Sequence, residues 1–336
     1  MTTLSTPHFQ PSMIRQAAAA LARYVVRTPL LNSAVLDRAL GVRLYVKTEN
    51  LQTTGSFKLR GALNKVLSLA PEARAHGVIT FSAGNHGQAV AAAAKFVGCS
   101  ATIVLPETAP QVKVDGCRWW GAKTVFYSPD AEDRRVVAQR IIDAEGLTLV
   151  HPFDDHLVMA GQGTIGLEIA EQLQQLSVRP DAALVNCSGG GLASGVLTAM
   201  RETYPELRFY LTEIAGFEKW ARSLRSRQPE QSKPVARTVM DGINGPNVGA
   251  KPLAVMLPQK AIGTFAVNDD QALRAVRAAF EHLKVVLEPA GAASLAALLA
   301  HREVFRGQTV VLVASGGNVD RMVFSQALAL PSEYLS

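Results

Sequence analysis

The chain has 336 residues and is 48% hydrophobic, which is ordinary for a globular protein of one or two domains. Its formal net charge of +6 raises the question of a nucleic-acid partner. The basic residues are scattered, however, and the densest cluster, 222–227, has no interleaved aromatic side chains. We therefore expect no nucleic-acid partner and interpret the positive surplus as suited to small anionic substrates.

The cysteines and the amino-terminal stretch indicate the compartment. Cys99, Cys117 and Cys187 are an odd number without CxxC spacing, so neither a disulfide framework nor a zinc site is expected. Residues 1–12 lack the apolar core of a signal peptide, and Lys95 interrupts the longest alanine-rich run. We expect a cytoplasmic protein without a membrane partner.

The first half of the chain alternates predicted strands and helices. Ser12 can cap an alanine-rich helix to about Tyr24, and residues 41–47 alternate as a half-buried strand does. This rhythm favours a parallel sheet with crossover helices. Further strands are predicted at 78–81, 101–105, 124–127 and 147–150, with an alanine-rich helix from the turn at 82–87 to about Val97 and helices at 111–116 and 131–145.

A second series of the same kind follows. Residues 218–237, rich in Ser, Gln, Arg and Pro, are interpreted as a loop. Strands are predicted at 182–186, 208–212 and 309–314, with helices at 163–173, 192–202, 268–283 and 291–301.

Three unusual turns follow the carboxyl ends of predicted strands, at 82–86, 188–191 and 315–318. In open parallel sheets this edge is where ligands bind. The sequence therefore predicts one site built from all three turns.

The turn Ser188-Gly189-Gly190-Gly191-Leu192 follows a strand and opens a helix. Its backbone amides can face an anion, and the helix dipole adds positive charge, so it is interpreted as a phosphate cradle. The spacing fits neither a dinucleotide GxGxxG motif nor a Walker loop. A glycine-rich turn used only for close packing is the alternative.

The other two turns carry polar side chains. Ser82-Ala83-Gly84-Asn85-His86 suits a carboxylate at its amides, and the Asn85 amide can donate to a ring hydroxyl, although Asn85 could equally be a helix cap. His86 is interpreted as part of the turn, not as a general base. Ser315 can place a neutral hydroxyl at the base of the sheet. If it meets the pyridine nitrogen of a bound cofactor, it leaves that nitrogen largely unprotonated; a capping serine is the alternative.

Lys58 stands within the small and apolar stretch Thr53–Gly61, directly behind Phe57. A desolvated amine has a lowered pKa and becomes a nucleophile toward carbonyl groups, which suggests a Schiff-base lysine. For a lysine taken at random, extension of the amine to water is the commoner outcome.

Six separated motifs occur together in one order, and with them the chain resembles the fold-type II pyridoxal-phosphate enzymes, most closely threonine/serine dehydratases and serine racemase. The resemblance spans about residues 27–320. The motifs are Glu49–Gln52, Gly55–Gly61, Ser82–Gly87, the glycine turn, Leu287–Gly291 and Ser315–Asn318.

The resemblance implies a residue for each part of the cofactor. Lys58 would form the Schiff base and act at Cα, Asn85 would bind the 3-hydroxyl, and Ser315 would face the ring nitrogen. The implied cofactor-binding residues are Phe57, Lys58, Asn85, Ser188, Gly189, Gly190, Gly191, Leu192, Gly242, Glu288 and Ser315. The implied substrate-carboxylate residues are Ser82, Ala83, Gly84, Asn85 and His86.

The resemblance also implies an α/β fold of two open parallel twisted sheets with helices on both faces. A large pyridoxal-phosphate-binding domain would comprise 1–77 and 153–336, and a small mobile domain 78–152. Related proteins of this kind form homodimers, so a homodimer is expected.

The implied activity is elimination of water from a 3-hydroxy L-amino acid, with threonine and serine as default substrates and a 2-oxo acid and ammonia as products. Hydroxyaspartate or a hydroxylated diamino acid from hydroxyectoine breakdown is an alternative, suggested by the unusual Asn244–Asn247 stretch. A racemase would need an acid where the chain has Ala83, and a cofactor-free anion-binding protein would leave Lys58 unused.

Any cation is uncertain. Glu213 matches a metal-ligating acid of serine racemase, but the later acidic position is occupied by Lys219.

Overall fold

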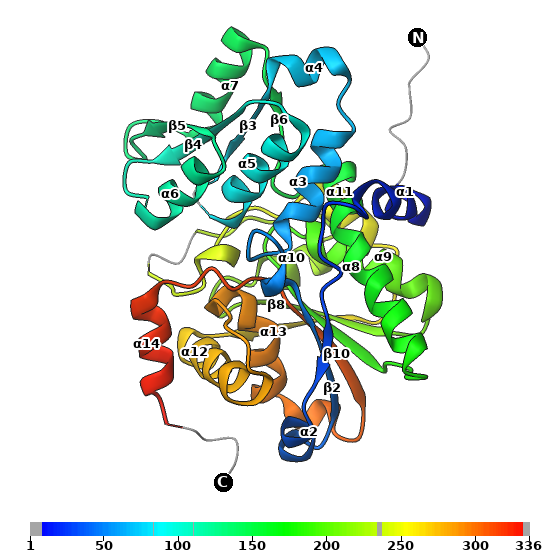
Figure 1. Ribbon diagram of the computed structural model, residues 1–336. Coiled ribbons are helices and arrows are strands. Elements are labelled where there is room, and N and C mark those ends of the chain that lie inside the picture. Colours follow the sequence, from blue (N-terminus) through cyan, green and yellow to red (C-terminus); the bar gives the residue numbers. More distant parts are fainter. Residues whose placement is uncertain (1–8, 83, 110, 234–236, 332–336) are drawn as a thin grey trace.

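The computed structural model describes residues 9–82, 84–109, 111–233 and 237–331. The described chain is an α/β protein with two parallel-rich sheets, each in its own lobe (Figure 1). The predicted fold class is confirmed. The domain boundaries at 77/78 and 152/153 remain a prediction, although every strand of the smaller sheet lies between residues 78 and 149.

The larger sheet has the strand order β1-β2-β10-β7-β8-β9. All neighbours are parallel except β1, a short edge strand that pairs antiparallel with β2. The strands are β1 (Leu30–Asn32), β2 (Arg43–Thr48), β7 (Ala182–Asn186), β8 (Arg208–Ile214), β9 (Ile262–Val267) and β10 (Thr309–Ala314).

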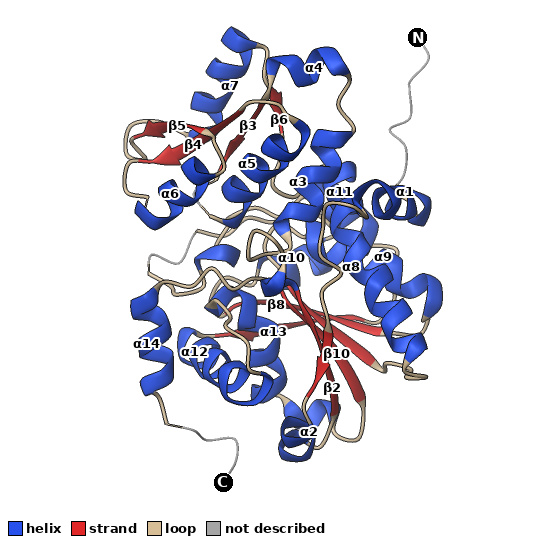
Figure 2. Cartoon of the chain, viewed as in Figure 1, coloured by secondary structure: helices blue, strands red, loops and turns tan. Residues whose placement is uncertain are grey.

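Helices cover both faces of this sheet, which is why its central strands are apolar on both sides (Figure 2). Along β10, Val310 and Leu312 pack toward one helical layer, while Val311 and Val313 pack toward the other. One layer contains α2 (Ala34–Leu40), α12 (Asp269–Ala278), α13 (Pro289–Ala300) and α14 (Arg321–Ala329); the other contains α8 (His156–Gln175), α9 (Gly191–Thr203), α10 (Lys219–Ser226) and α11 (Ala250–Met256).

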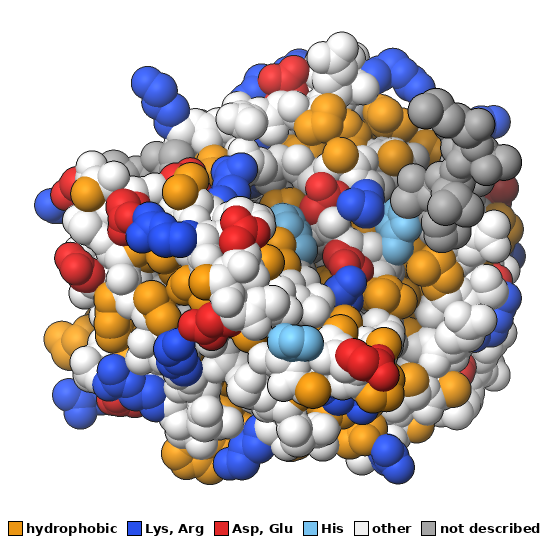
Figure 3. Space-filling view, turned by 90° about the horizontal axis from the view of Figure 1, so that it is seen from above, with side chains coloured by type: hydrophobic (Ala, Val, Ile, Leu, Met, Phe, Trp, Pro, Cys, Tyr) orange, Lys and Arg blue, Asp and Glu red, His pale blue; other side chains and the backbone are white. Residues whose placement is uncertain are grey.

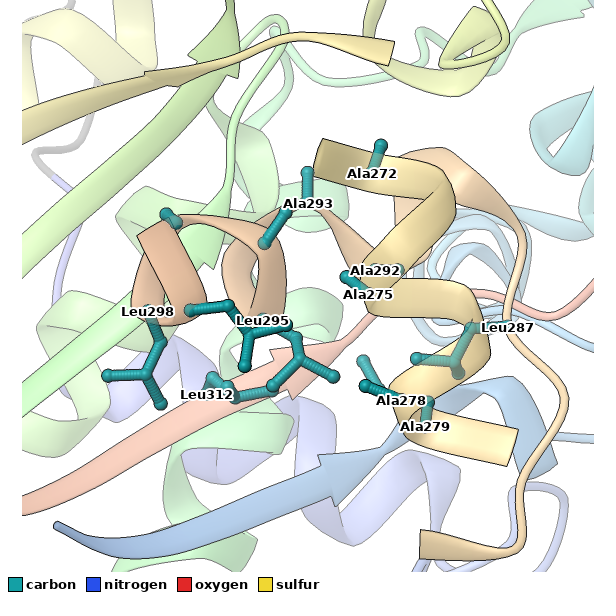
Figure 4. Packing of buried hydrophobic residues seen from close by; sticks show 14 of the residues in the cluster. Ala272, Ala275, Ala278, Ala279, Leu287, Ala292, Ala293, Leu295, Leu298 and Leu312 are labelled. Carbon is teal, nitrogen blue, oxygen red and sulfur yellow. The ribbon is translucent and has the colours of Figure 1, made fainter. Parts of the chain in front are cut away.

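Small side chains let α12 and α13 approach each other closely. Ala272, Ala275 and Ala279 of α12 and its continuation meet Ala292 and Ala293 of α13 in one buried cluster (Figure 4). This close packing fixes the start of α13, where Glu288 precedes the helix.

The smaller sheet is entirely parallel, with the order β5-β4-β3-β6. Helices α3 and α5 cover one face together with α6, and α7 covers the other. Its strands are β3 (Val78–Phe81), β4 (Ala101–Pro106), β5 (Lys123–Tyr127) and β6 (Thr148–Leu149); the remaining helices are α1 (Pro11–Leu21), α3 (Lys58–Leu67), α4 (Pro71–His76), α5 (Asn85–Val97), α6 (Gln111–Trp119) and α7 (Arg134–Glu145).

Three predictions about elements were wrong. Ser12 does not cap the first helix, because α1 already begins at Pro11, after Gln10, and it ends at Leu21. The stretch 218–237 is not all loop, because α10 occupies its first part and buries Trp220. The helix predicted from residue 163 begins at His156, because the Asp155 carboxylate caps it by accepting from the amides of Leu157 and Val158.

The surface and the helix lengths bear on the predicted partners. In Figure 3, Lys and Arg side chains are interspersed with Asp and Glu across the face shown, and form no continuous basic patch there. Within the described ranges, none of the helices combines the length and the apolar character that crossing a bilayer requires.

Candidate active site

The segment before Lys58 is fixed against the turn that follows β10. Ser56 and Gly316 form an isolated antiparallel bridge, the Phe57 amide donates to the Ser315 carbonyl over 3.1 Å, and the Gly317 amide donates to the Gly55 carbonyl over 2.8 Å. Two turns distant in sequence are thereby held together. Lys58 then begins α3, so its side chain leaves from a rigid position.

The Lys58 amine lies in a largely desolvated place. Its Nζ donates to the carbonyl of Pro152 over 2.9 Å and lies 5.1 Å from the centroid of the Phe57 ring. No carboxylate among the described residues forms an ion pair with it, and burial lowers the pKa of Lys58 to about 8. A substantial fraction of the amine is therefore neutral near physiological pH and able to act as a nucleophile or base.

Two residues further on, Arg60 belongs to a buried charge cluster formed with Lys47, Glu49 and Glu168. The Arg60 guanidinium donates to both Glu49 oxygens, over 2.8 and 2.9 Å, and to Glu168 over 2.6 Å. Lys47 Nζ also donates to Glu168, over 2.6 Å. Although burial opposes them, both carboxylates hold the pKa of Arg60 above its usual range, and the cluster joins the first turn of α3 to β2 and α8.

The glycine turn lies between β7 and α9, as predicted. Gly190 has φ +97°, a conformation that favours glycine, and a Cβ there would lie 2.2 Å from the Trp220 ring. A Cβ at Gly189 would lie equally close to the Phe153 ring, and the Trp220 indole nitrogen donates to the Ser188 carbonyl over 2.7 Å. The turn is thus held from outside, and α9 begins directly after it.

Pro152 and Phe153 connect this turn to Lys58. The Pro152 carbonyl accepts from the lysine amine, while the next ring packs against Gly189 and the Phe153 backbone approaches Gly191. Lys58 and the glycine turn therefore share one wall.

Asn85 belongs to a chain of amide hydrogen bonds that reaches Thr54, in the segment before Lys58. Its Oδ1 accepts from Asn318 Nδ2 over 2.7 Å, and that same Nδ2 also donates to the Thr54 carbonyl over 2.9 Å. Because a carbonyl can only accept, these bonds assign the orientation of both amides, so Asn85 presents its NH₂ group to Glu288 Oε1, 2.5 Å away.

Glu288 is a buried carboxyl whose pKa is raised to about 7, mainly by burial and next by the charge of Asp241. Gly242 lies close to it, since a Cβ at Gly242 would be 3.9 Å from Glu288 Oε1. A Cβ at Gly316 would approach the same oxygen to 2.2 Å. The structure therefore brings Asn85, Glu288, Gly242 and the Ser315–Gly316 turn together, as the sequence analysis expected.

His86 is held as a neutral structural residue. Its Nε2 donates to the Val150 carbonyl over 2.9 Å, and burial, followed by the charge of Lys58, lowers the pKa of His86 to about 3. This agrees with its interpretation as part of the turn. Ser82 and Gly84 lie at the same turn, where the Gly84 amide faces Ser82 Oγ at 3.4 Å. Ala83 lies outside the described residues.

Residues that the sequence analysis did not single out also reach the site. Asn186 ends β7 and donates to the Ser315 hydroxyl over 3.0 Å. Trp220 supports the glycine turn, and Lys113 of α6 forms an ion pair with Asp241. A polar residue ending an otherwise apolar buried strand was a usable signal for Asn186; for Trp220 the sequence offered none, because its stretch was interpreted as loop.

At the suspected cation position, the Glu213 carboxylate is engaged in hydrogen bonds with the protein backbone. Both Glu213 oxygens accept from backbone amides at the start of α10, Trp220 over 2.8 Å and Ala221 over 3.1 Å. Lys219 is buried nearby, with its Nζ 4.5 Å from the Phe217 ring centroid. Over the described part of the chain, no three His, Cys, Asp or Glu side chains gather as a metal site would require.

Together these groups suit an enzyme that binds a phosphate-bearing aldehyde cofactor. The residues fit such a group, because Lys58 has no competing carboxylate partner among the described residues and side chains at Gly189 and Gly190 would collide with the walls of the cradle. The family described as pyridoxal-phosphate dependent enzymes matches residues 21–316, and the chain belongs to that family. Its cofactor is pyridoxal 5'-phosphate.

Named relatives are similar over nearly the whole chain. L-threonine ammonia-lyase of Geobacter sulfurreducens is 40% identical over 332 residues, 96% of this chain and 80% of the relative. Serine racemase of Dictyostelium discoideum is 34% identical over 320 residues, 94% of this chain and 96% of the relative. The structure of the processed form of threonine deaminase isoform 2 from Solanum lycopersicum has a TM-score of 0.87 at 32% identity, covering 95% of this chain and 87% of that one.

Proposed function

We propose that the protein is a pyridoxal-phosphate-dependent lyase that removes water from a 3-hydroxy L-amino acid of the threonine or serine type. The products are a 2-oxo acid and ammonia. The observation that carries this proposal is that the Lys58 amine, whose pKa is lowered to about 8, lies close to the glycine turn, whose amides can bind an anion. The similarity to threonine ammonia-lyases over 96% of the chain supports the same reaction class.

Lys58 has two tasks in this proposal. Its amine would hold the cofactor when that group is bound, and the same amine is the base that would remove the proton from the substrate Cα. A pKa of about 8 suits both, because the amine is neutral often enough to accept a proton and basic enough to keep it. When bound, pyridoxal phosphate supplies the electron sink for the Cα bond.

The other residues of the site would bind and orient the cofactor and the substrate. Backbone amides of 188–192 would bind the phosphate, Phe57 would pack beside the ring, and Asn85, held by Asn318, would donate to the ring hydroxyl. Glu288 and Gly242 would line the ring edge, Ser315 would face the ring nitrogen, and the 82–86 turn would bind the substrate carboxylate. The amides of this turn suit an anion at the start of α5.

Hydroxyaspartate and a hydroxylated diamino acid stay as alternative substrates. The stretch Asn244–Asn247, which suggested these substrates, lies beside the glycine turn, since a Cβ at Gly245 would be 2.9 Å from Ser188 Oγ. That position favours a role in holding the cofactor over a role in choosing the substrate side chain. Threonine and serine are therefore the preferred proposal.

Racemisation is the second candidate activity, because serine racemase is among the relatives. It needs a proton donor on the ring face opposite Lys58, and the methyl of Ala83 cannot serve. Chiral analysis of recovered serine separates the two activities. Appearance of D-serine from L-serine would establish racemisation in addition to elimination, and Ala83→Ser is expected to introduce it if this acid is all that is missing.

We further propose a cytoplasmic location and a homodimer. The three cysteines are all free thiols, which suits a reducing compartment. Sedimentation of the purified holoenzyme tests the dimer.

The test of the function is a lysine substitution with a matched control. Lys58→Ala removes both the covalent attachment and the base, so 2-oxo acid formation from L-threonine and L-serine is expected to fall by several orders of magnitude, about as far as losing a catalytic group does. The exposed Lys123→Ala is expected to behave as wild type. Full activity in Lys58→Ala, with its circular dichroism unchanged, would refute the mechanism.

A further inference from the structure

Asn186 forms hydrogen bonds with every donor and acceptor of its side-chain amide. Its Nδ2 donates to the Gly291 carbonyl over 2.9 Å and to Ser315 Oγ over 3.0 Å. Its Oδ1 accepts from the Ser294 amide over 2.6 Å and from the Ser294 hydroxyl. Asn186, Ser294 and Ser315 are all buried, so water does not compete for these bonds.

Two backbone groups decide which way this amide points. The Gly291 carbonyl cannot donate, so it must face Nδ2; the Ser294 amide cannot accept, so it must face Oδ1. A flipped amide would break both contacts. The group that faces Ser315 is therefore an N–H donor, and Ser315 Oγ is the acceptor in that bond.

This leaves the Ser315 hydroxyl proton in need of an acceptor. Within the part of the chain that the structure describes, the hydroxyl donates to no protein group; only the bond from Asn186 involves its oxygen. A buried hydroxyl proton without an acceptor is costly. An unprotonated ring nitrogen would satisfy it, whereas a protonated one would present a second donor and leave the hydroxyl proton unpaired.

We propose that Asn186 is a positioning residue that fixes the Ser315 hydroxyl as a donor to the cofactor ring nitrogen and so keeps that nitrogen unprotonated. This inference rests on the proposed function in one respect, the placement of Ser315 at the nitrogen. The consequence is a cofactor whose ring withdraws electrons weakly, which favours prompt elimination over long-lived carbanions.

The test is nitrogen NMR of the holoenzyme reconstituted with cofactor labelled at the ring nitrogen. The wild-type signal is expected at the position of an unprotonated, hydrogen-bonded nitrogen. Ser294→Ala is the matched control: it removes one hydroxyl but keeps the backbone amide that orients Asn186, so its signal is expected to match wild type.

Asn186→Asp reverses the arrangement. A carboxylate oxygen facing Ser315 accepts the hydroxyl proton, which frees the serine oxygen to accept from the ring, so the signal is expected to shift to that of a protonated nitrogen. If this variant does not take up cofactor, Asn186→Leu replaces it. That variant leaves Ser315 unanchored, and its signal is expected to move toward that of Ser315→Ala.

The outcomes distinguish the placement of Ser315 at the ring nitrogen from the positioning role of Asn186. A Ser315→Ala signal identical to wild type means that Ser315 does not face the nitrogen, which overturns its assignment under the proposed function. If Ser315→Ala shifts the signal but the Asn186 variants do not, the positioning role is overturned alone. A protonated nitrogen in the wild-type holoenzyme overturns the inference whatever the variants do.

Discussion

Among single residues, Glu288 is a buried carboxyl whose protonation changes close to neutral pH. Its pKa is raised to about 7 because it is buried, and the charge of Asp241 adds to the effect. A carboxyl that is partly protonated near neutrality can both accept from Asn85 and donate a hydrogen bond of its own. A group of this kind at the ring edge can follow changes of charge in the bound cofactor.

Glu288 also makes the stability of the cofactor-free protein depend on pH. The folded pKa lies above the unfolded one, so between about pH 4.5 and pH 7 the folded state binds more protons and stability falls as pH rises. Glu288→Gln is expected to remove this dependence, which amounts to a few kcal/mol at most. Thermal unfolding of the apo-protein at about pH 5 and about pH 8 measures it. The exposed Glu303→Gln is the control, and equal pH dependence in all three proteins would contradict the assignment.

Individual site residues could be predicted from the sequence only where neighbouring residues in the chain mark them. Asn85 and the glycine turn were visible because each stands in a short motif at the end of a predicted strand, and Lys58 was visible because it stands in a small and apolar stretch. Asn186 and Asn318 act through partners more than 100 residues away, such as the bond from Asn186 to Ser315, and no local pattern encodes such a partner. Ser315 was predicted, but the direction of its proton was not.

Among elements, α10 shows how tertiary packing overrides composition. Its sequence is rich in Ser and Arg, yet the helix forms because Trp220 inserts beneath the glycine turn and Glu213 accepts from amides of its first turn. The strands β3, β7 and β10 were predicted within their observed bounds because they are continuous apolar runs buried on both faces. Short elements such as β1 and α11 lack such a signal.

The support that α10 gives to the glycine turn is testable. Trp220→Phe keeps an aromatic side chain beneath the turn but removes the donor to the Ser188 carbonyl, together with the distal indole carbons that lie against Gly190. Loss of one such bond costs about 1 kcal/mol, so cofactor affinity is expected to fall about five-fold. Equilibrium titration of apo-protein with pyridoxal phosphate measures this. Trp119→Phe, at an exposed tryptophan of α6, should bind as wild type does, and equal affinities for both variants would argue against the role.

For the whole molecule, the important contact joins the two lobes near the site. Lys113 of α6, in the lobe of the smaller sheet, pairs with Asp241, which lies beside Gly242 in the other lobe. Both charges influence the pKa of Glu288, so the pair lies close enough to the site to act on it. If the smaller lobe moves on binding substrate, this pair stabilises the closed arrangement.

A charge swap tests this contact. Lys113→Asp is expected to lower kcat/KM by up to about five-fold, the range of a partly exposed ion pair, and the loss should shrink in high salt. The double variant Lys113→Asp with Asp241→Lys restores opposite charges and is expected to recover most of the activity. Steady-state kinetics at low and high ionic strength give the comparison, and a double variant no better than the single one would count against the ion pair.

The buried cluster of Lys47, Glu49, Arg60 and Glu168 has a consequence for how this chain can evolve. The cluster has two cations and two anions, so removing any one member leaves a net charge in a buried place, at a cost of about 3–5 kcal/mol. A domain is stable by only about 5–15 kcal/mol, so each single step consumes much of the margin. The four side chains must therefore be exchanged for apolar ones together. Directed evolution by single substitutions is expected to accept changes in the turns of the site before it accepts one in this cluster.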